Sequence, residues 1–206
     1  MTTAVDTVVF DIGNVLISWD PEHLYKALIP DEKDRAQFLT EVCSPAWNLE
    51  QDRGRTWQEA LDILIPQFPE KEALIRAYYE RWSEMVPGAI KGTVALLAEL
   101  KDKGVPLYAI TNFSSDKFEE TRTRFPFLRT SFIDTVISAD EKLVKPDTRL
   151  YDVLFDRNPS LKREACVFTD DSLANIEGAK KAGMQAVHFE SPEKLRADLK
   201  RFGLPV

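Results

Sequence analysis

The chain contains 206 residues, of which 44% are hydrophobic and 30% are charged, and its formal net charge is −7. This length suits one domain, or a core domain with an inserted subdomain, and the composition is typical of globular proteins. The acidic balance argues against nucleic acid as a partner. No apolar run approaches the ~20 residues of a membrane span, and the N-terminus has no targeting pattern, so we expect no membrane association and a cytoplasmic protein.

The first predicted element is a buried strand that ends at a carboxylate. Val8, Val9 and Phe10 form a continuous apolar run, as in an inner strand of a parallel sheet. The run stops at Asp11, and Gly13 with its neighbouring asparagine then turns the backbone. Since chemistry in open α/β sheets collects beyond the carboxyl ends of the strands, Asp11 stands where a reactive group would be placed. The alternative is that Asp11 only opens a turn.

A block with helical spacing follows, from residue 18 to residue 86, and we expect about four helices in it. The predicted ranges are 21–28, 31–42, 56–65 and 70–85, and the third begins with a capping box between Thr56 and Glu59. The aromatic side chains of the block are expected to form its packing rather than a binding surface. These aromatic residues are Trp47, Trp57, Tyr78, Tyr79 and Trp82.

Strands and helices then alternate to the end of the chain. Predicted strands lie at 105–110, 134–138, 164–169 and 185–189, and predicted helices at 90–101, after 145–147 and at 174–182. Such alternation predicts an α/β fold with a parallel sheet and helices on both faces.

Polar residues follow four of these strands and are expected to meet at one edge of the sheet. They are Asp11, Thr111 with Asn112, Lys145, and Asp170 with Asp171. Two carboxylates ~4 Å apart repel by ~4 kcal/mol at an effective dielectric constant of 20. Lys145 offsets one negative charge, and a divalent cation or protonation must offset the rest. Because Mg²⁺ prefers oxygen ligands, the pattern predicts a magnesium site beside a nucleophile. The alternative is an aspartate pair that caps a helix and a solvated lysine.

These segments resemble the four ordered motifs of the haloacid dehalogenase (HAD) superfamily. The resemblance is carried by Phe-Asp11-Ile-Gly13-Asn-Val, Ile-Thr111-Asn112, Val-Lys145-Pro-Asp and Phe-Thr-Asp170-Asp171-Ser-x-x-Asn175. It implies a Rossmann-like core of residues 1–17 and 87–206, with a helical cap of residues 18–86 inserted after the first motif. Most family members transfer phosphoryl groups through an aspartyl-phosphate, and fewer are dehalogenases.

The resemblance also implies roles for individual residues. Asp11 would be the nucleophile, the Thr111 hydroxyl and the Asn112 backbone N–H would hold phosphoryl oxygens, and Lys145 would neutralise charge. Asp11, the carbonyl oxygen of Gly13, Asp170 and Asp171 would bind Mg²⁺. Asn175 would orient Asp171 or would have a structural role in its own helix. The implied partner is a small phosphate ester, and the chain would be a monomer or a homodimer.

Gly13 departs from the family pattern, because phosphatases of the family usually carry a second Asp there as general acid and base. Loss of a general acid typically costs ~10²–10⁴-fold in rate. Either the leaving group needs little protonation, as in a sugar 1-phosphate or an acyl phosphate, or halide is displaced, or the protein only binds ligands. Asp20 is a candidate substitute by position alone. In the cap, the glycine of Asp52-Arg53-Gly54 indicates a loop that reaches inward, or a surface turn.

The acidic pair Asp170-Asp171 favours a phosphatase, since dehalogenases of the family lack a metal and carry hydroxyl and amide residues there. The first motif further resembles that of a phosphatase group similar to glucose 1-phosphate phosphatase. We therefore expect a Mg²⁺-dependent phosphatase, with a metal-independent 2-haloacid dehalogenase and a catalytically silent binding protein as alternatives.

Overall fold

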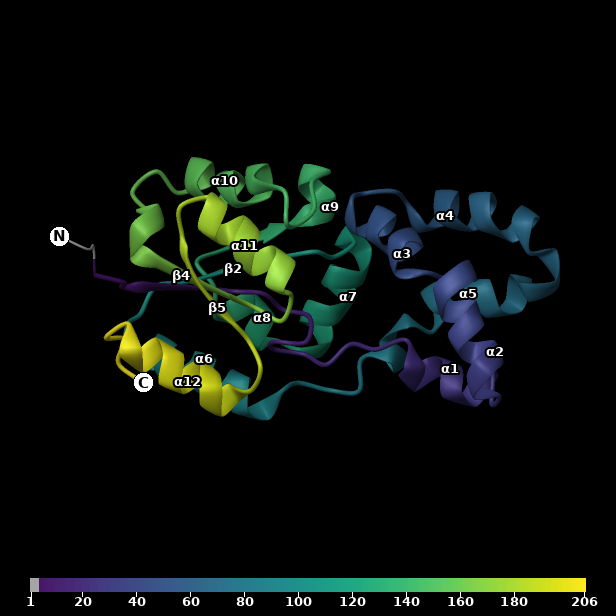
Figure 1. Cartoon of the computed structure of the whole chain (residues 1–206), viewed down its shortest axis with the longest axis horizontal. Coiled ribbons are helices and arrows are strands. Elements are labelled where there is room, and N and C mark those ends of the chain that lie inside the picture. Colours follow the sequence, from purple (N-terminus) through teal and green to yellow (C-terminus); the bar gives the residue numbers. More distant parts are fainter. Residues whose placement is uncertain (1–3) are drawn as a thin grey trace.

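The computed structural model describes residues 4–206, and a five-stranded parallel sheet forms its centre (Figure 1). The strands are β1 (Thr7–Phe10), β2 (Leu107–Thr111), β3 (Asp134–Ile137), β4 (Cys166–Asp170) and β5 (Gln185–His188). Their order across the sheet is β3-β2-β1-β4-β5, and all neighbours are parallel. The predicted α/β fold is confirmed, and the strand that leads to Asp11 is the central one.

Helices cover both faces of this sheet because successive strand side chains point to opposite sides. Val8 and Phe10 belong to one buried apolar cluster, whereas Val9 belongs to the other. The first cluster includes residues of α6 (Lys91–Asp102), α7 (Ser115–Arg124), α8 (Phe127–Thr130) and α12 (Pro192–Arg201). The second includes residues of α10 (Thr148–Arg157) and α11 (Leu173–Lys181), while the short α9 (Ser138–Glu141) follows β3.

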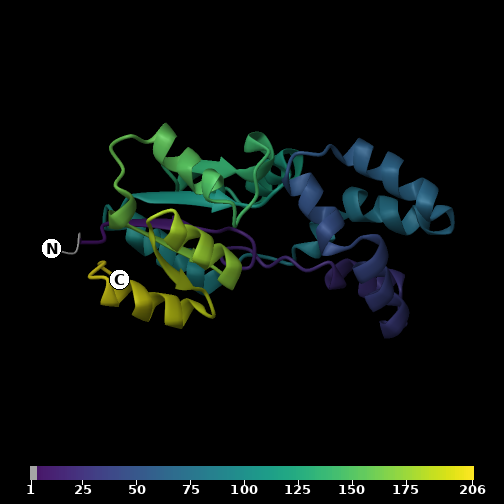
Figure 2. The ribbon, with the colours of Figure 1, turned by 45° about the horizontal axis from the view of Figure 1, so that its top comes forward.

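A separate group of helices lies beyond one end of the sheet (Figures 1 and 2). It consists of α1 (Glu22–Leu28), α2 (Glu32–Gln37), the π-helical turn η1 (Phe38–Val42), α3 (Pro45–Asp52), α4 (Trp57–Leu64), α5 (Glu72–Glu80) and short 3₁₀ turns that include η4 (Trp82–Met85). The capping box that opens α4 is present. Among residues 4–206, no helix is long and apolar enough to cross a membrane. The division into a core domain and a cap of residues 18–86 stays a prediction.

The structure differs from the expected helices in two places within this group. The helix expected at 70–85 ends at Glu80, and η4 continues it after Arg81. Helix α3 was not expected, because Ser44-Pro45 was interpreted only as the end of the preceding helix. Here Ser44 Oγ accepts a hydrogen bond from Trp47 N at 3.2 Å, and Pro45 occupies the first turn, so both residues start a helix.

The C-terminal end of α3 contacts the core closely. Ser138 Oγ donates a hydrogen bond to the backbone oxygen of Asp52 at 2.5 Å. Gly54 has a φ of +100°, and a Cβ atom at this position would lie 2.7 Å from the carbonyl oxygen of Ala139. Nearby, Trp57 Nε1 donates to Ser114 Oγ at 3.2 Å. These contacts hold α3 and α4 over the carboxyl ends of the strands.

We expect Gly54→Ala to destabilise the protein more than Gly104→Ala. Both positions have positive φ, and a residue with a side chain in this conformation destabilises the folded state by about 1–3 kcal/mol. Only Gly54 would also press its Cβ against backbone, since a Cβ at Gly104 meets nothing within 4 Å. Urea unfolding gives the free energy of unfolding of each variant. Equal losses would show that α3 is not packed against α9 in solution.

Candidate active site

The ends of the strands bring together the carboxylates that the sequence singled out. Asp11 follows β1, Asp170 ends β4, and Asp171 comes next in the chain. One carboxylate oxygen of each of these three residues lies within 4.8 Å of the other two. Lys145 Nζ lies 2.8 Å from Asp11 Oδ1 and 2.7 Å from Asp170 Oδ2. The expected convergence at one sheet edge is therefore found.

Lys145 is buried, and its position is set by several contacts. Its side chain is 1% exposed, and Nζ also donates a hydrogen bond to the backbone oxygen of Ile110 at 3.1 Å. The Asn112 side chain accepts from Lys145 N at 2.8 Å and donates to Lys145 O at 3.2 Å. Asn112 thus fixes the backbone that carries the lysine, a role that the sequence did not indicate.

Asp170 is almost completely saturated with hydrogen bonds. Besides Lys145, it accepts from Ser172 N at 2.8 Å and from Asn175 Nδ2 at 3.0 and 3.1 Å. The expectation that Asn175 orients Asp171 is therefore wrong, because the amide reaches Asp170 instead. The side chain of Asp171 is exposed, and its hydrogen bond is with Asn14.

The three carboxyl groups of the site differ in pKa. Burial raises the pKa of Asp11 to about 8, with Lys145 acting against this rise and Asp170 adding to it. Partial burial raises the pKa of Asp171, and so does the charge of Asp170. At Asp170, burial is outweighed by Lys145, Ser172 and Asn175, so its pKa lies below the ordinary value. A further positive charge at the site would lower the pKa of Asp11 and favour its ionised form.

Two further features belong to the same edge of the sheet. Thr111 Oγ1 is buried at the end of β2 and has no hydrogen-bond partner among residues 4–206. An unpaired buried hydroxyl costs about 1–3 kcal/mol, which a ligand oxygen would remove. Gly13 lies in open space, since a Cβ built on it meets nothing within 4 Å.

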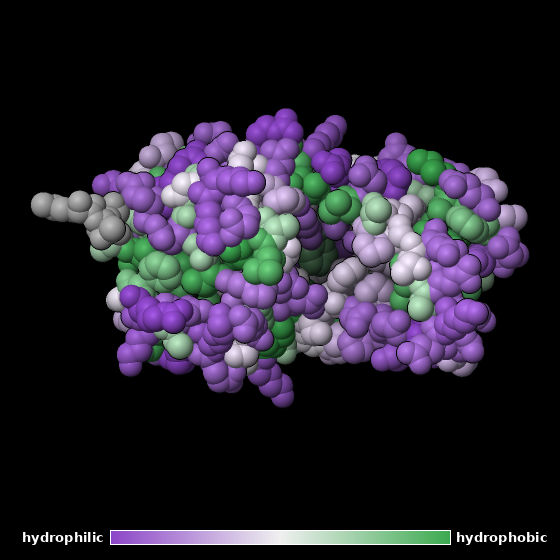
Figure 3. Space-filling model, in the orientation of Figure 1, coloured by the Kyte–Doolittle hydropathy of each residue, from purple (hydrophilic) through white to green (hydrophobic). Residues whose placement is uncertain are grey.

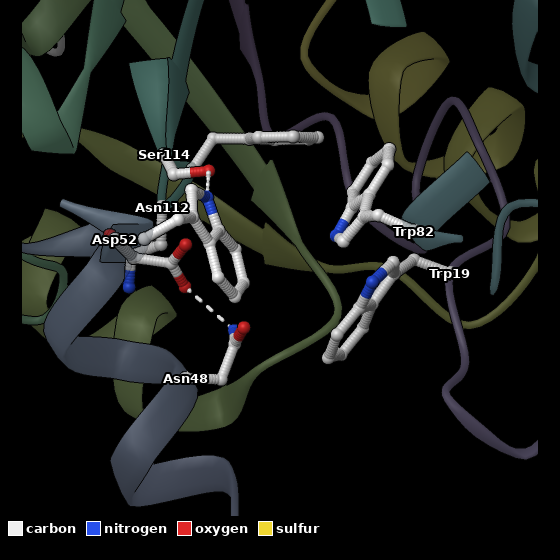
Figure 4. A pocket seen from close by; sticks show the side chains of 9 residues that line it. Trp19, Asn48, Asp52, Trp82, Asn112 and Ser114 are labelled. Carbon is white, nitrogen blue, oxygen red and sulfur yellow. Dashed lines mark hydrogen bonds between the residues drawn. The ribbon is translucent and has the colours of Figure 1, made fainter. Parts of the chain in front are cut away.

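A cavity opens between these residues and the helical group, where the space-filling surface is hollowed (Figure 3). Gly13, Asn112 and Ser114 line it from the core side. Four aromatic residues also line it, and Asn48 and Asp52 lie across the cavity from Trp19 and Trp82 (Figure 4). The four aromatic residues are Trp19, Trp57, Trp82 and Phe113. Trp57 and Trp82 were expected to form packing rather than a binding surface, and both do lie in the buried apolar cluster while also lining this cavity.

Asp52 and Asp20 occupy very different places. Asp52 is half-buried at the end of α3, and Asn48 Nδ2 donates a hydrogen bond to its Oδ2 at 3.2 Å (Figure 4). Asp20 is exposed, and its Oδ1 accepts a hydrogen bond from Glu22 N, at the start of α1, at 2.8 Å. Of the stretch Asp52-Arg53-Gly54, only Asp52 lines the cavity, while Arg53 and Gly54 form an exposed turn. Asp20 is not among the cavity-lining residues.

Comparison with known proteins agrees with this geometry. Residues 44–189 match the family model described as haloacid dehalogenase-like hydrolase. The chain is 26% identical over 190 residues to the sesquiterpene phosphatase astK of Aspergillus oryzae, which covers 92% of each protein.

Two solved structures share the fold. A HAD family enzyme of Bacteroides thetaiotaomicron, in complex with magnesium and inorganic phosphate, has a TM-score of 0.69 and 20% identity, covering 91% of this chain and 95% of that one. The L-2-haloacid dehalogenase of Xanthobacter autotrophicus has a TM-score of 0.62 and 18% identity, covering 96% and 83%. Both structures show the fold only, whereas the family match decides the membership: this chain belongs to the haloacid dehalogenase-like hydrolases.

Proposed function

We propose that this protein is a Mg²⁺-dependent phosphatase that acts on small phosphate monoesters through a phosphorylated Asp11. The observation that carries the proposal is the group of three carboxylates around one buried lysine. Such a group needs a further cation, and oxygen-rich acidic sites favour Mg²⁺.

The residues present fit a magnesium ion in number and in chemistry. Asp11, Asp171 and the carbonyl oxygen of Gly13 are the ligands that we assign to it, and Asp170 lies next to them and contributes through its charge or a water molecule. The oxygens of Asp170 each accept two hydrogen bonds already, so Asp170 supplies mainly charge and holds Lys145. The carboxylate oxygens of Asp171 make fewer hydrogen bonds and are therefore more available to a metal ion. When bound, the ion neutralises the carboxylates and the phosphoryl oxygens as charge develops.

The chain's own side chains account for binding and attack. Asp11 Oδ attacks phosphorus in line and forms a covalent intermediate. Lys145, 2.8 Å from Asp11, offsets the charge that builds up between nucleophile and phosphoryl group. The Thr111 hydroxyl and the Asn112 backbone N–H bind phosphoryl oxygens, and the unpaired Thr111 Oγ1 supports this assignment.

The cavity wall supports an apolar organic group on the phosphate. Four aromatic rings surround the space next to Gly13, and rings of this kind favour apolar ligand surface. The relative from Aspergillus oryzae acts, by its name, on sesquiterpene phosphates, which are also apolar. A sugar 1-phosphate, as in the glucose 1-phosphate phosphatase-like group, is the second candidate, because tryptophan rings with amide and carboxyl groups also suit sugars.

Asp11→Asn should abolish hydrolysis of p-nitrophenyl phosphate, because the amide is a poor nucleophile and a poorer metal ligand. Asp6→Asn is the matched control, since Asp6 is an exposed aspartate at the opposite end of the same strand. The activity of both variants is measured as phosphate release with and without Mg²⁺. Activity that persists in Asp11→Asn contradicts the nucleophile assignment.

Removal of metal should also abolish phosphate release from the unmodified protein. EDTA should reduce the rate to background, and added Mg²⁺ should restore it. The same samples are tested for chloride release from 2-chloropropionate. Chloride release in EDTA, without phosphatase activity, would contradict the proposal and establish the dehalogenase alternative.

Trp82→Phe should lower kcat/KM for hexyl phosphate about ten times more than it lowers kcat/KM for acetyl phosphate, because a smaller ring leaves apolar ligand surface uncovered. Trp47→Phe is the control: Trp47 packs against Tyr78 with ring centroids 5.2 Å apart and is not among the cavity-lining residues. A wild-type preference for glucose 1-phosphate over hexyl phosphate would instead favour the sugar phosphate.

A further inference from the structure

The position of Gly13 leaves the proposed reaction without a proton donor on the core side of the cavity. A glycine has no side chain that titrates, and the space around its Cβ position is open to 4 Å. An alkyl leaving group departs as an alkoxide unless it is protonated, and a positioned acid typically contributes 10²–10⁴-fold. The acid must therefore come from another part of the wall.

Asp52 is the one ionisable side chain among the described residues that line this cavity. It comes from the helical group and shares the wall with Gly13 and Asn112. Asn48 Nδ2 donates a hydrogen bond to its carboxyl group at 3.2 Å, and the Ser138 hydroxyl donates one to its backbone oxygen at 2.5 Å.

The surroundings of Asp52 favour its protonated form near neutral pH. Burial raises its pKa to about 7, while a hydrogen bond with the Ser114 backbone and the charge of Lys145 act in the opposite direction. Asp52 lines the same cavity as Asn112, whose side chain is hydrogen-bonded to the backbone of Lys145. A group with these properties can both give and take a proton.

We propose that the Asp52 carboxyl group protonates the oxygen of the leaving group and so takes the place of the side chain that Gly13 lacks. Asp11 Oδ forms a bond to phosphorus, the bond between phosphorus and the ester oxygen breaks, and its electron pair remains on that oxygen. Asp52 gives its proton to this oxygen, and the alcohol leaves. The Asp52 carboxylate then takes a proton from the water that attacks phosphorus, which releases phosphate and restores Asp11. This inference rests on the phosphatase function proposed above.

The dependence of rate on the leaving group tests this role. Asp52→Asn should lower kcat/KM for hexyl phosphate about 10²–10⁴-fold, because hexanol is a poor leaving group. For p-nitrophenyl phosphate, which departs without protonation, the loss should stay within tenfold. Mg²⁺ affinity by calorimetry should stay within twofold of wild type, since Asp52 is not assigned to the metal. Gly13→Asp, added to Asp52→Asn, should restore part of the hexyl phosphate activity.

Asp20→Asn serves as the control, because this carboxylate is exposed and does not line the cavity. Melting temperatures verify that all variants are folded. Equal losses on both esters, or no loss on hexyl phosphate, would overturn the assignment of Asp52 while leaving the phosphatase intact. If the wild type hydrolyses neither ester with Mg²⁺, the proposed function fails, and the role of Asp52 fails with it.

Discussion

The ion pairs of Lys145 with Asp11 and Asp170 are the interaction on which the rest of the site depends. Two carboxylates reach one buried ammonium group at 2.8 and 2.7 Å, from strand ends that are about 160 residues apart in the chain. Buried charges are tolerated only when they are paired and hydrogen-bonded. The hydrogen bonds from Lys145 Nζ to Ile110 O and from Asn175 to Asp170 satisfy that condition, and Asp171 then adds the negative charge that the lysine cannot balance.

The helical group places apolar side chains next to this charged edge of the sheet. Trp57, Trp82 and Trp19 line the space above Gly13, and hydrogen bonds of Ser114 and Ser138 connect that wall to the core. Electrostatic interactions beside apolar walls are stronger than in bulk water. The charged edge suits the phosphoryl group and the aromatic wall suits the organic group, so each part of the structure has a separate task in the proposed reaction.

The sequence predicted the sheet and the carboxylate cluster well, because both follow from local rules. Apolar runs such as residues 8–10 identify inner strands, and parallel strands necessarily end at one edge. The cavity was not predictable in this way. Whether Trp82 packs inside the helical group or faces a ligand depends on how two distant segments meet, and Ser44-Pro45 ends one helix while starting another. Asp52 drew attention only through the glycine that follows it.

The central claim is that the three carboxylates share a magnesium ion beside a reactive Asp11. A crystal structure of the protein with Mg²⁺ and beryllium fluoride tests this most directly. The account predicts a fluoroberyllate group on Asp11 and an ion with ligand distances of about 2.0–2.1 Å to oxygens of Asp11, Asp171 and the Gly13 carbonyl. An unmodified Asp11, with no ion between the carboxylates at millimolar Mg²⁺, would contradict it.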